Sequence, residues 1–340
     1  MCKILRTFAQ IFDTLRRYMK KISVTIALSL SVVLSLYSER VETLPYADFN
    51  QWVVRYIKQS GILGGKTVVL YAVGPTDTIR KNGPFIYGQN GNIWSSSNTY
   101  AKVFGVETGS GTVRPEYRDK DNQYCCRLDT KHEVIKVLGT MHVLATGSLY
   151  TGRMIEPVKS RDDPYQNIDF GVKFTKRPDY LMFDYKAKIS PEKKILDMKG
   201  SGEPKVKAGH DEAQAIIVLQ RRWEDADGHI YAERVATGYE RFAKDQVEWV
   251  NGHRVKLYYG DMSAEPLYKK YETALCLVKD GRRAMNSKGK IVPIQEVGWA
   301  KEGTIPTHIL INFSSGCYEA YVGYDGNSLW VDNVRLVYKE

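Results

Sequence analysis

The sequence predicts an all-β protein, an antiparallel β-sandwich or barrel that follows an export signal and one short helix. Three observations favour this fold class. Beyond residue 62, apolar side chains recur at every second position in short runs, and clusters of Gly, Asn, Asp and Pro separate these runs. Parallel strands would need helical crossovers of about a dozen residues, and no such helical pattern lies between the runs.

The first 38 residues are predicted to be a signal peptide. Met19-Lys20-Lys21 precedes an uncharged apolar run from Ile22 to Leu36, and polar residues then resume. A cationic lead before a short apolar run is typical of an export signal. Translation from Met19 would supply the same signal, and an uncleaved anchor helix is the alternative. We expect a mature protein that begins near Glu39, has no membrane span and resides in the periplasm, on the cell surface or outside the cell.

A short helix is predicted next. The apolar residues with helical spacing are Phe49, Trp52, Val53, Tyr56 and Ile57. Gly61 follows them as a stop signal.

The strands follow in order. Their alternating or β-branched apolar runs lie at residues 66–73, 181–189, 213–219, 230–232, 255–259, 309–313 and 334–338. Gly, Lys and Arg gather at residues 279–303, which predicts a long excursion between strands.

The composition excludes several classes of protein. Hydrophobic residues make up 43% of the chain and charged residues 26%, which excludes a disordered chain and a polytopic membrane protein. The net charge is +10, but residues 1–38 hold six basic residues and one acidic residue. The remaining 43 basic and 38 acidic residues predict no nucleic-acid partner.

No cofactor is expected. The sequence contains no P-loop, nucleophile elbow, H-E-x-x-H or dinucleotide fingerprint, and no Cys/His pair has zinc spacing. A structural calcium ion is the alternative at two acidic loops, although neither loop has the full twelve-residue pattern. The residues of these loops are Asp119, Asp121 and Asn122, and Glu224, Asp225 and Asp227.

Four cysteines remain after removal of the signal. They are Cys125, Cys126, Cys276 and Cys317. Neighbouring residues of a strand point to opposite faces, and the apolar alternation around this pair predicts that Cys126 points inward and Cys125 outward. Four buried or free thiols are expected, and their disulfide state is left open.

The aromatic residues favour a saccharide ligand. They make up 11% of the chain and include 23 Tyr and 6 Trp. Aromatic rings also pack well in sheets, so only their neighbours favour binding. Trp94 and Asn98 share a polar loop-like stretch, strand 180–188 presents Tyr180, Asp184 and Lys186 on one face, and Trp223 adjoins Arg221, Arg222 and Glu224.

Paired carboxylates would support hydrolysis of a glycosidic bond. Retaining glycosidases hold two carboxyl groups about 5–5.5 Å apart and inverting ones roughly 6.5–9.5 Å apart. The candidates by residue type are Asp184, Asp211, Glu212 and Asp332. Asp332 also has a structural explanation, because the apolar alternation shifts at Asp332-Asn333, as at a bulge where the acid binds local backbone amides.

The C-terminal segment PTHILINFSSGCYEAYVGYDGNSLWVDNVRLVY resembles the closing pattern of the family called the putative carbohydrate metabolism domain. Upstream resemblances are carried by residues 94–98, 147–154, 169–189 and 210–219. Together they cover residues 46–340, with departures at Lys173, at Gly316-Cys317 and in the insertion 279–303.

The resemblance implies a galactose-binding-domain-like jelly roll, a fold frequent among carbohydrate-binding modules, and a polysaccharide or oligosaccharide partner. It carries over no catalytic residues. Motif position and side-chain type indicate ligand-binding roles for Trp94, Asn98, Asp184, Lys186 and Ser315, and a structural role for all five is the alternative. The leading hypothesis is a non-enzymatic, exported glycan-binding protein. The alternatives are a glycoside hydrolase and a structural or adhesive surface protein that binds a protein partner.

Overall fold

The computed structural model describes residues 16, 19, 39–103, 105–118, 123–136, 140–160, 162–200, 202–266, 268, 275 and 281–339. The chain divides into two compact units, one of residues 42–336 and one of residues 1–41 together with 337–340. Apart from residues 16 and 19, the predicted signal peptide lies outside the described residues, as do Cys276 and the acidic loop at 119–122. In the described part of the chain, no helix has the length and apolar character needed to cross a membrane.

The elements with described bounds are strands and one short 3₁₀ helix, η1 (Gly61–Leu63). The strands are β1 (Glu39–Thr43), β2 (Trp52–Lys58), β3 (Thr67–Val73), β4 (Asp77–Ile79), β5 (Trp94–Ser96), β6 (Thr99–Val103), β7 (Val106–Ser110), β8 (Val113–Tyr117), β9 (Tyr124–Lys136), β10 (Thr140–Thr146), β11 (Ser148–Met154), β12 (Ile168–Phe170), β13 (Val172–Lys173), β14 (Tyr180–Lys188), β15 (Lys194–Asp197), β16 (Lys205–Ala208), β17 (Ala213–Glu224), β18 (Ile230–Phe242), β19 (Gln246–Lys256), β20 (Tyr258–Tyr259), β21 (Arg283–Met285), β22 (Ile291–Trp299), β23 (His308–Ser314), β24 (Val322–Gly323) and β25 (Ser328–Lys339).

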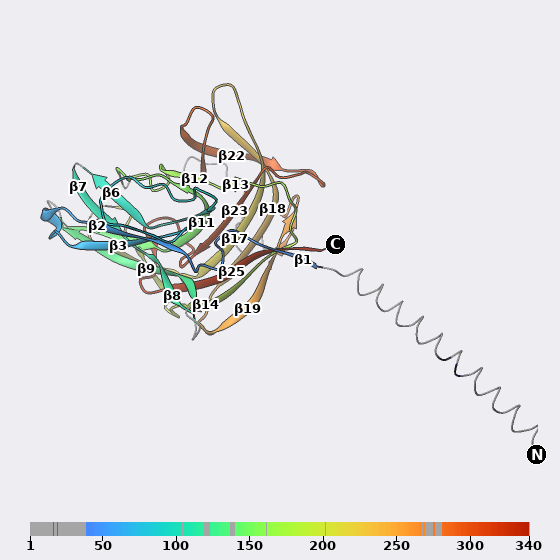
Figure 1. The fold of residues 1–340 in the computed structure, drawn as a ribbon, viewed down its shortest axis with the longest axis horizontal. Helices are drawn as coiled ribbons and strands as arrows, with labels where there is room; N and C mark the ends of the chain where they lie inside the picture. Colours follow the sequence, from blue (N-terminus) through green and yellow to red (C-terminus); the bar gives the residue numbers. More distant parts are fainter. Residues whose placement is uncertain are drawn as a thin grey trace, which may run out of the picture. The chain divides into compact units, whose positions relative to one another are not determined.

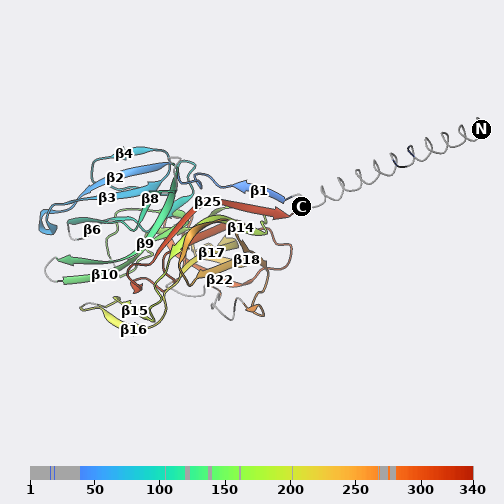
Figure 2. The same cartoon turned by 90° about the horizontal axis from the view of Figure 1, so that it is seen from below.

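Two large sheets form the body of the fold (Figures 1 and 2). Sheet I has the strand order β10-β9-β25-β14-β19, and β8 pairs with β9. Sheet II has the order β12-β11-β23-β17-β18-β22-β21, and β5 pairs with β11, β13 with β23 and β20 with β18. Smaller sheets are β16-β15-β24, β3-β2-β4 and β6-β7. The all-β sandwich is therefore confirmed, whereas its jelly-roll type stays a prediction.

The main core lies between the two sheets. The ring of Phe183 on β14 packs against Phe313 on β23, with centroids 4.9 Å apart, and against Phe242 on β18. Leu181, which lies two residues before Phe183 on the same face of β14, is also fully buried. This is the period-two pattern that predicted the strands, because one face of each strand meets the opposite sheet.

Sheet II is buried on its other face as well. Val218 on β17 and Leu310 on β23 pack in a second cluster with Val53 on β2 and Tyr150 on β11. Strands covered on both faces read as nearly continuous apolar runs, which is the pattern of residues 213–219.

The predicted helix is wrong, because residues 52–58 form strand β2. This strand pairs with β3 from Trp52↔Val73 to Lys58↔Thr67. Val53, Arg55 and Ile57 alternate as buried residues. Arg55 is a charged residue at a core position, where Glu156 neutralises it at 2.7 Å. A charge in the buried row concealed the period of two, so the remaining apolar residues had helical spacing.

Within the predicted excursion 279–303, residues 283–285 and 291–299 are strands of sheet II. These strands are β21 and β22, and β22 runs parallel to β18 from Ile230↔Ile294 to Arg234↔Trp299 (Figure 1). A second parallel pair joins β2 and β4. These pairs correct the expectation of purely antiparallel sheets. Ile294 packs with Ile230 in a small core of its own, which explains why β22 docks there.

The two neighbouring cysteines point to opposite faces of β9, as the alternation predicted, and both are fully buried free thiols. Cys126 lies in the core. Cys125 lies beneath polar side chains on the opposite face of β9, where its Sγ donates a hydrogen bond to the Glu116 carbonyl. Burial raises the pKa of Cys125 to about 12. That face of sheet I is therefore covered by its own side chains.

Candidate functional site

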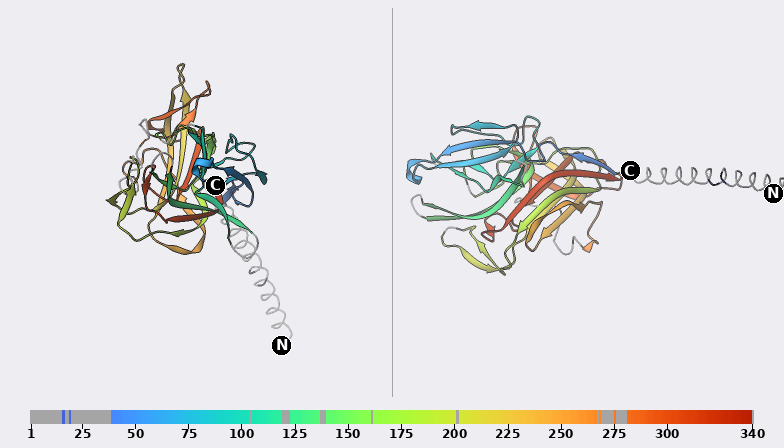
Figure 3. Two further views of the ribbon diagram at one scale, coloured as in Figure 1. Left: turned by 90° about the vertical axis from the view of Figure 1, so that its left-hand side faces the viewer. Right: turned by 60° about the horizontal axis from the view of Figure 1, so that its bottom comes forward.

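The polar face of sheet I is the candidate site. We use this name for the side of the sheet that points away from sheet II, around the neighbouring strands β25, β14 and β19 (Figures 2 and 3). Since side chains alternate along a strand, the strand that buries Phe183 against sheet II turns Asp184 and Lys186 to this face. The same alternation places Trp330 and Asp332 of β25 and Trp249 of β19 there.

Cations and aromatic rings alternate across this face. The Lys186 ammonium lies over the Trp330 ring at 4.8 Å from its centroid and over the Trp249 ring at 5.6 Å. Arg127 lies over Trp330 at 4.7 Å, and Arg118 lies over Trp249 at 4.3 Å. All four distances are within the range of cation–π attraction. The result is a chain in which Lys186, on the middle strand, connects the two tryptophans.

Two aspartates meet beside this chain. Arg118 Nη1 donates a hydrogen bond to Asp184 Oδ2 at 2.7 Å and to Asp332 Oδ2 at 2.5 Å. Asp184 also accepts from the Asn333 side chain at 2.9 Å and from the Gly252 N–H at 2.7 Å. One guanidinium therefore bridges two buried carboxylates, and Asp184, which also pairs with Arg335 at 3.3 Å, has the richer set of donors.

The surroundings move the pKa values of the two acids apart. Burial raises the pKa of Asp332 to about 6, and the Arg118 hydrogen bond only partly opposes this rise. Burial also acts on Asp184, but the hydrogen bonds from Asn333, Gly252 and Arg118 outweigh it, so its pKa lies below its ordinary value. Pairs of acids whose pKa values diverge are frequent at functional sites.

Asp332 makes the stability of the protein depend on pH. Because its pKa is higher in the folded chain, about 6, than in the unfolded chain, ionisation of Asp332 favours unfolding as the pH rises from 4 to 7. We expect the free energy of unfolding of the wild type, relative to Asp332→Asn, to fall by about 2 kcal/mol over this range. Urea unfolding of both proteins at several pH values measures the difference. A difference that stays constant with pH would contradict the raised pKa.

Three of the predicted site residues hold the core together. Trp94 is fully buried, and its Nε1 donates to the Pro45 carbonyl at 2.8 Å. The Asn98 side chain bonds backbone groups of Tyr71, Thr112 and Val113. Ser315 Oγ bonds Thr130 Oγ1 and the Gly147 backbone. These contacts are structural, and in the described residues none of them reaches Asp184 or Lys186. A ligand-binding role for the three stays a prediction.

The structure joins Asp184 and Lys186 with residues that the sequence did not single out, namely Trp249, Trp330, Arg118 and Arg127. A signal for Trp330 was present, because Trp330 and Asp332 are two residues apart on a strand, like Asp184 and Lys186. What the sequence lacked was the strand order that makes β25 and β14 neighbours.

The four acids considered for hydrolysis separate into two places. Asp184 and Asp332 lie together on the polar face. Asp211 is buried elsewhere and accepts the backbone N–H groups of Cys317 and Tyr324, and Glu212 follows it in the chain. Asp332 Oδ1 also accepts the Asn333 N–H, and Asn333 has a φ of 50°, which is the bulge geometry expected there.

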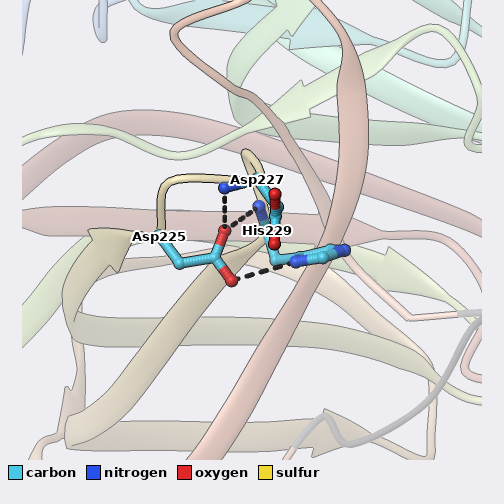
Figure 4. A group of neighbouring side chains, drawn as sticks. All are labelled: Asp225, Asp227 and His229. Atoms are coloured by element: carbon cyan, nitrogen blue, oxygen red, sulfur yellow. Dashed lines mark hydrogen bonds and ion pairs between the residues drawn. The ribbon is translucent and has the colours of Figure 1, made fainter.

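The turn between β17 and β18 brings Asp225, Asp227 and His229 together, with their ligand atoms within 4.8 Å of one another (Figure 4). Asp225 accepts hydrogen bonds from the Asp227 N–H and from both the N–H and Nδ1 of His229. The His229 hydrogen bond is the main reason that the pKa of Asp225 is lowered to about 2. The Glu224 carboxylate accepts hydrogen bonds from the N–H and the hydroxyl of Ser287. The Asp225 carboxylate thus already closes the turn, and a calcium ion stays a prediction.

Comparison with known proteins places the chain in a family. Residues 78–337 match the family described as "Putative carbohydrate metabolism domain", and no curated protein matches the chain. A crystal structure of a "putative glycoside hydrolase" from Bacteroides thetaiotaomicron VPI-5482 is 16% identical, covers 84% of this chain and 71% of its own, and has a TM-score of 0.42. Another protein with that description, from Bacteroides vulgatus ATCC 8482, is 13% identical, covers 88% and 96%, and has a TM-score of 0.38. Because the family match spans most of the chain, the protein belongs to the putative carbohydrate metabolism domain family.

Proposed function

We propose that this protein is an exported carbohydrate-binding protein that holds a saccharide on the polar face of sheet I. The observation that carries the proposal is the row Trp330, Lys186 and Trp249 on three neighbouring strands, beside the acids Asp184 and Asp332. The family concerns carbohydrate metabolism, and the proposal of export rests on the signal-like pattern of residues 1–38.

The spacing of the row suits a short oligosaccharide. Neighbouring strands are about 4.8 Å apart, so two tryptophans that lie two strands apart are separated by roughly 10 Å. That is close to the length of two linked sugar rings. Trp249 is half-buried and keeps part of its indole exposed, which allows the C–H face of a sugar ring to stack on it. Trp330 is only 9% exposed and lies beneath Lys186 and Arg127, so we propose that the second sugar ring contacts it together with these two cations. The surrounding carboxylate, guanidinium and amide groups can bind the hydroxyl groups of a sugar.

The experiment compares Trp249→Ala and Trp330→Ala with Trp223→Ala in affinity gels that contain a panel of polysaccharides. Trp223 is the matched control, because it is 41% exposed and stacks on Tyr231 but lies on sheet II. We expect each of the first two variants to lose about tenfold in affinity and the control to bind like the wild type. Thermal unfolding checks that the variants are folded.

Other outcomes would contradict the proposal. Loss of binding only in Trp223→Ala would place the ligand on sheet II. Release of reducing sugar by the wild type, abolished in Asp332→Asn or Asp184→Asn, would indicate the glycoside hydrolase instead. Absence of binding to every glycan, together with a stable complex with a defined protein partner, would indicate the adhesive or structural protein.

A further inference from the structure

We infer that the saccharide bound on the polar face is acidic and that Lys186 binds its carboxylate, as in a uronate-containing glycan. This inference rests on the proposed function and names the class of its ligand. It starts from a difference between Lys186 and the other cations of the face.

The neighbouring cations are neutralised by carboxylates. Arg118 pairs with Asp184 and Asp332, and Arg127 pairs with Glu116 at 2.8 Å and with Asp129 at 2.7 Å. In the described part of the chain, Lys186 has no carboxylate within ion-pair distance, and its ammonium is instead placed over the rings of Trp249 and Trp330. Of the three described cations that lie over Trp249 and Trp330, which are Lys186, Arg118 and Arg127, Lys186 is therefore the one whose charge is available to a ligand.

The charge balance of the ion-paired groups beside Lys186 agrees with this. Among the described residues, the ion pairs around the two tryptophans connect five cations to four carboxylates, and Lys186 adds a sixth cation. The cations are Arg114, Arg118, Arg127, Lys131, Arg335 and Lys186, and the carboxylates are Glu116, Asp129, Asp184 and Asp332. An anionic ligand would neutralise this excess, whereas a neutral sugar would leave it in place.

The geometry also favours an acid over a neutral sugar. Lys186 covers part of both tryptophan rings, so a neutral sugar that stacks there has to displace a cation–π contact. The carboxylate of an acidic sugar instead forms a charge-assisted hydrogen bond with the Lys186 ammonium. The ammonium then moves off the tryptophan rings, and the sugar ring that carries the carboxylate can stack on them. Ring stacking and ion pairing then act on the same sugar unit.

The test uses polygalacturonate and alginate, each paired with its carboxyl-reduced, neutral form. Affinity is measured for the wild type, for Lys186→Gln and for Lys188→Gln, since Lys188 is an exposed lysine on the same strand. We expect the wild type to bind at least one acidic polymer about tenfold or more tightly than its reduced form, and less tightly at high salt. Lys186→Gln should lose this preference, Lys186→Arg should keep part of it, and Lys188→Gln should keep all of it.

The two proposals fail in different ways. Equal binding of the acidic and the reduced polymers would overturn the inference of an acidic ligand. So would a preference for the acidic polymer that is unchanged in Lys186→Gln. In both cases the affinity of Trp249→Ala still reports whether the face binds sugar. Binding of neutral glycans alone would also overturn the inference of an acidic ligand and leave the proposed function in place. Absence of binding to every polymer, acidic or neutral, would contradict the acidic ligand and the proposed function together.

Discussion

Deletion of residues 327–340 is expected to abolish soluble folding. The deleted segment contains β25, which lies between β9 and β14 in sheet I. Its residues Leu329, Val331 and Val334 are fully buried. Removal of a central strand leaves backbone N–H and C=O groups unpaired on both neighbours and opens the core between the sheets. This is a larger loss than the whole stability of a typical domain.

The measurement is the yield of soluble protein and its thermal unfolding. A shorter deletion of residues 339–340 is the control, because Lys339 is exposed and the central part of β25 remains. The control should express and melt like the full chain. A protein that lacks residues 327–340 but still melts in one cooperative transition would refute the central position of β25.

The second large effect is expected for Glu156→Ala. Glu156 and Arg55 form an ion pair with side-chain exposures of 0% and 2%. Glu156 also accepts hydrogen bonds from the Tyr100 N–H and the Tyr87 hydroxyl. Removal of the carboxylate leaves the Arg55 cation buried without its counter-charge, which typically costs 3–5 kcal/mol. We expect a loss of about that size in the free energy of unfolding, measured in urea.

Two comparisons separate the buried pair from a surface effect. Lys102 pairs with Glu107 and is 51% exposed, so Lys102→Ala should cost less than about 1 kcal/mol. The double variant Arg55→Met/Glu156→Met removes both charges and should recover most of the lost stability. A small effect of Glu156→Ala, equal to that of Lys102→Ala, would show that the pair is not buried in solution.

The sequence was sufficient to predict individual strands, because alternation of apolar residues is a local property. The runs at 181–189 and 309–313 became β14 and β23 for this reason. Prediction failed where the buried row contains a charge, as in β2. There a partner distant in the sequence decides the burial, as Glu156 does for Arg55.

In the candidate site, too, some features follow from the local sequence and others only from the tertiary structure. The sequence by itself determined that Asp184 and Lys186 share one face of a strand, because residues two apart in a strand always do. Only the tertiary structure decided that Trp330 and Trp249 flank them, since β25 and β19 reach β14 from distant parts of the chain. Strand order depends on how the apolar faces of the whole chain are buried together, and no local pattern of residues encodes that pairing.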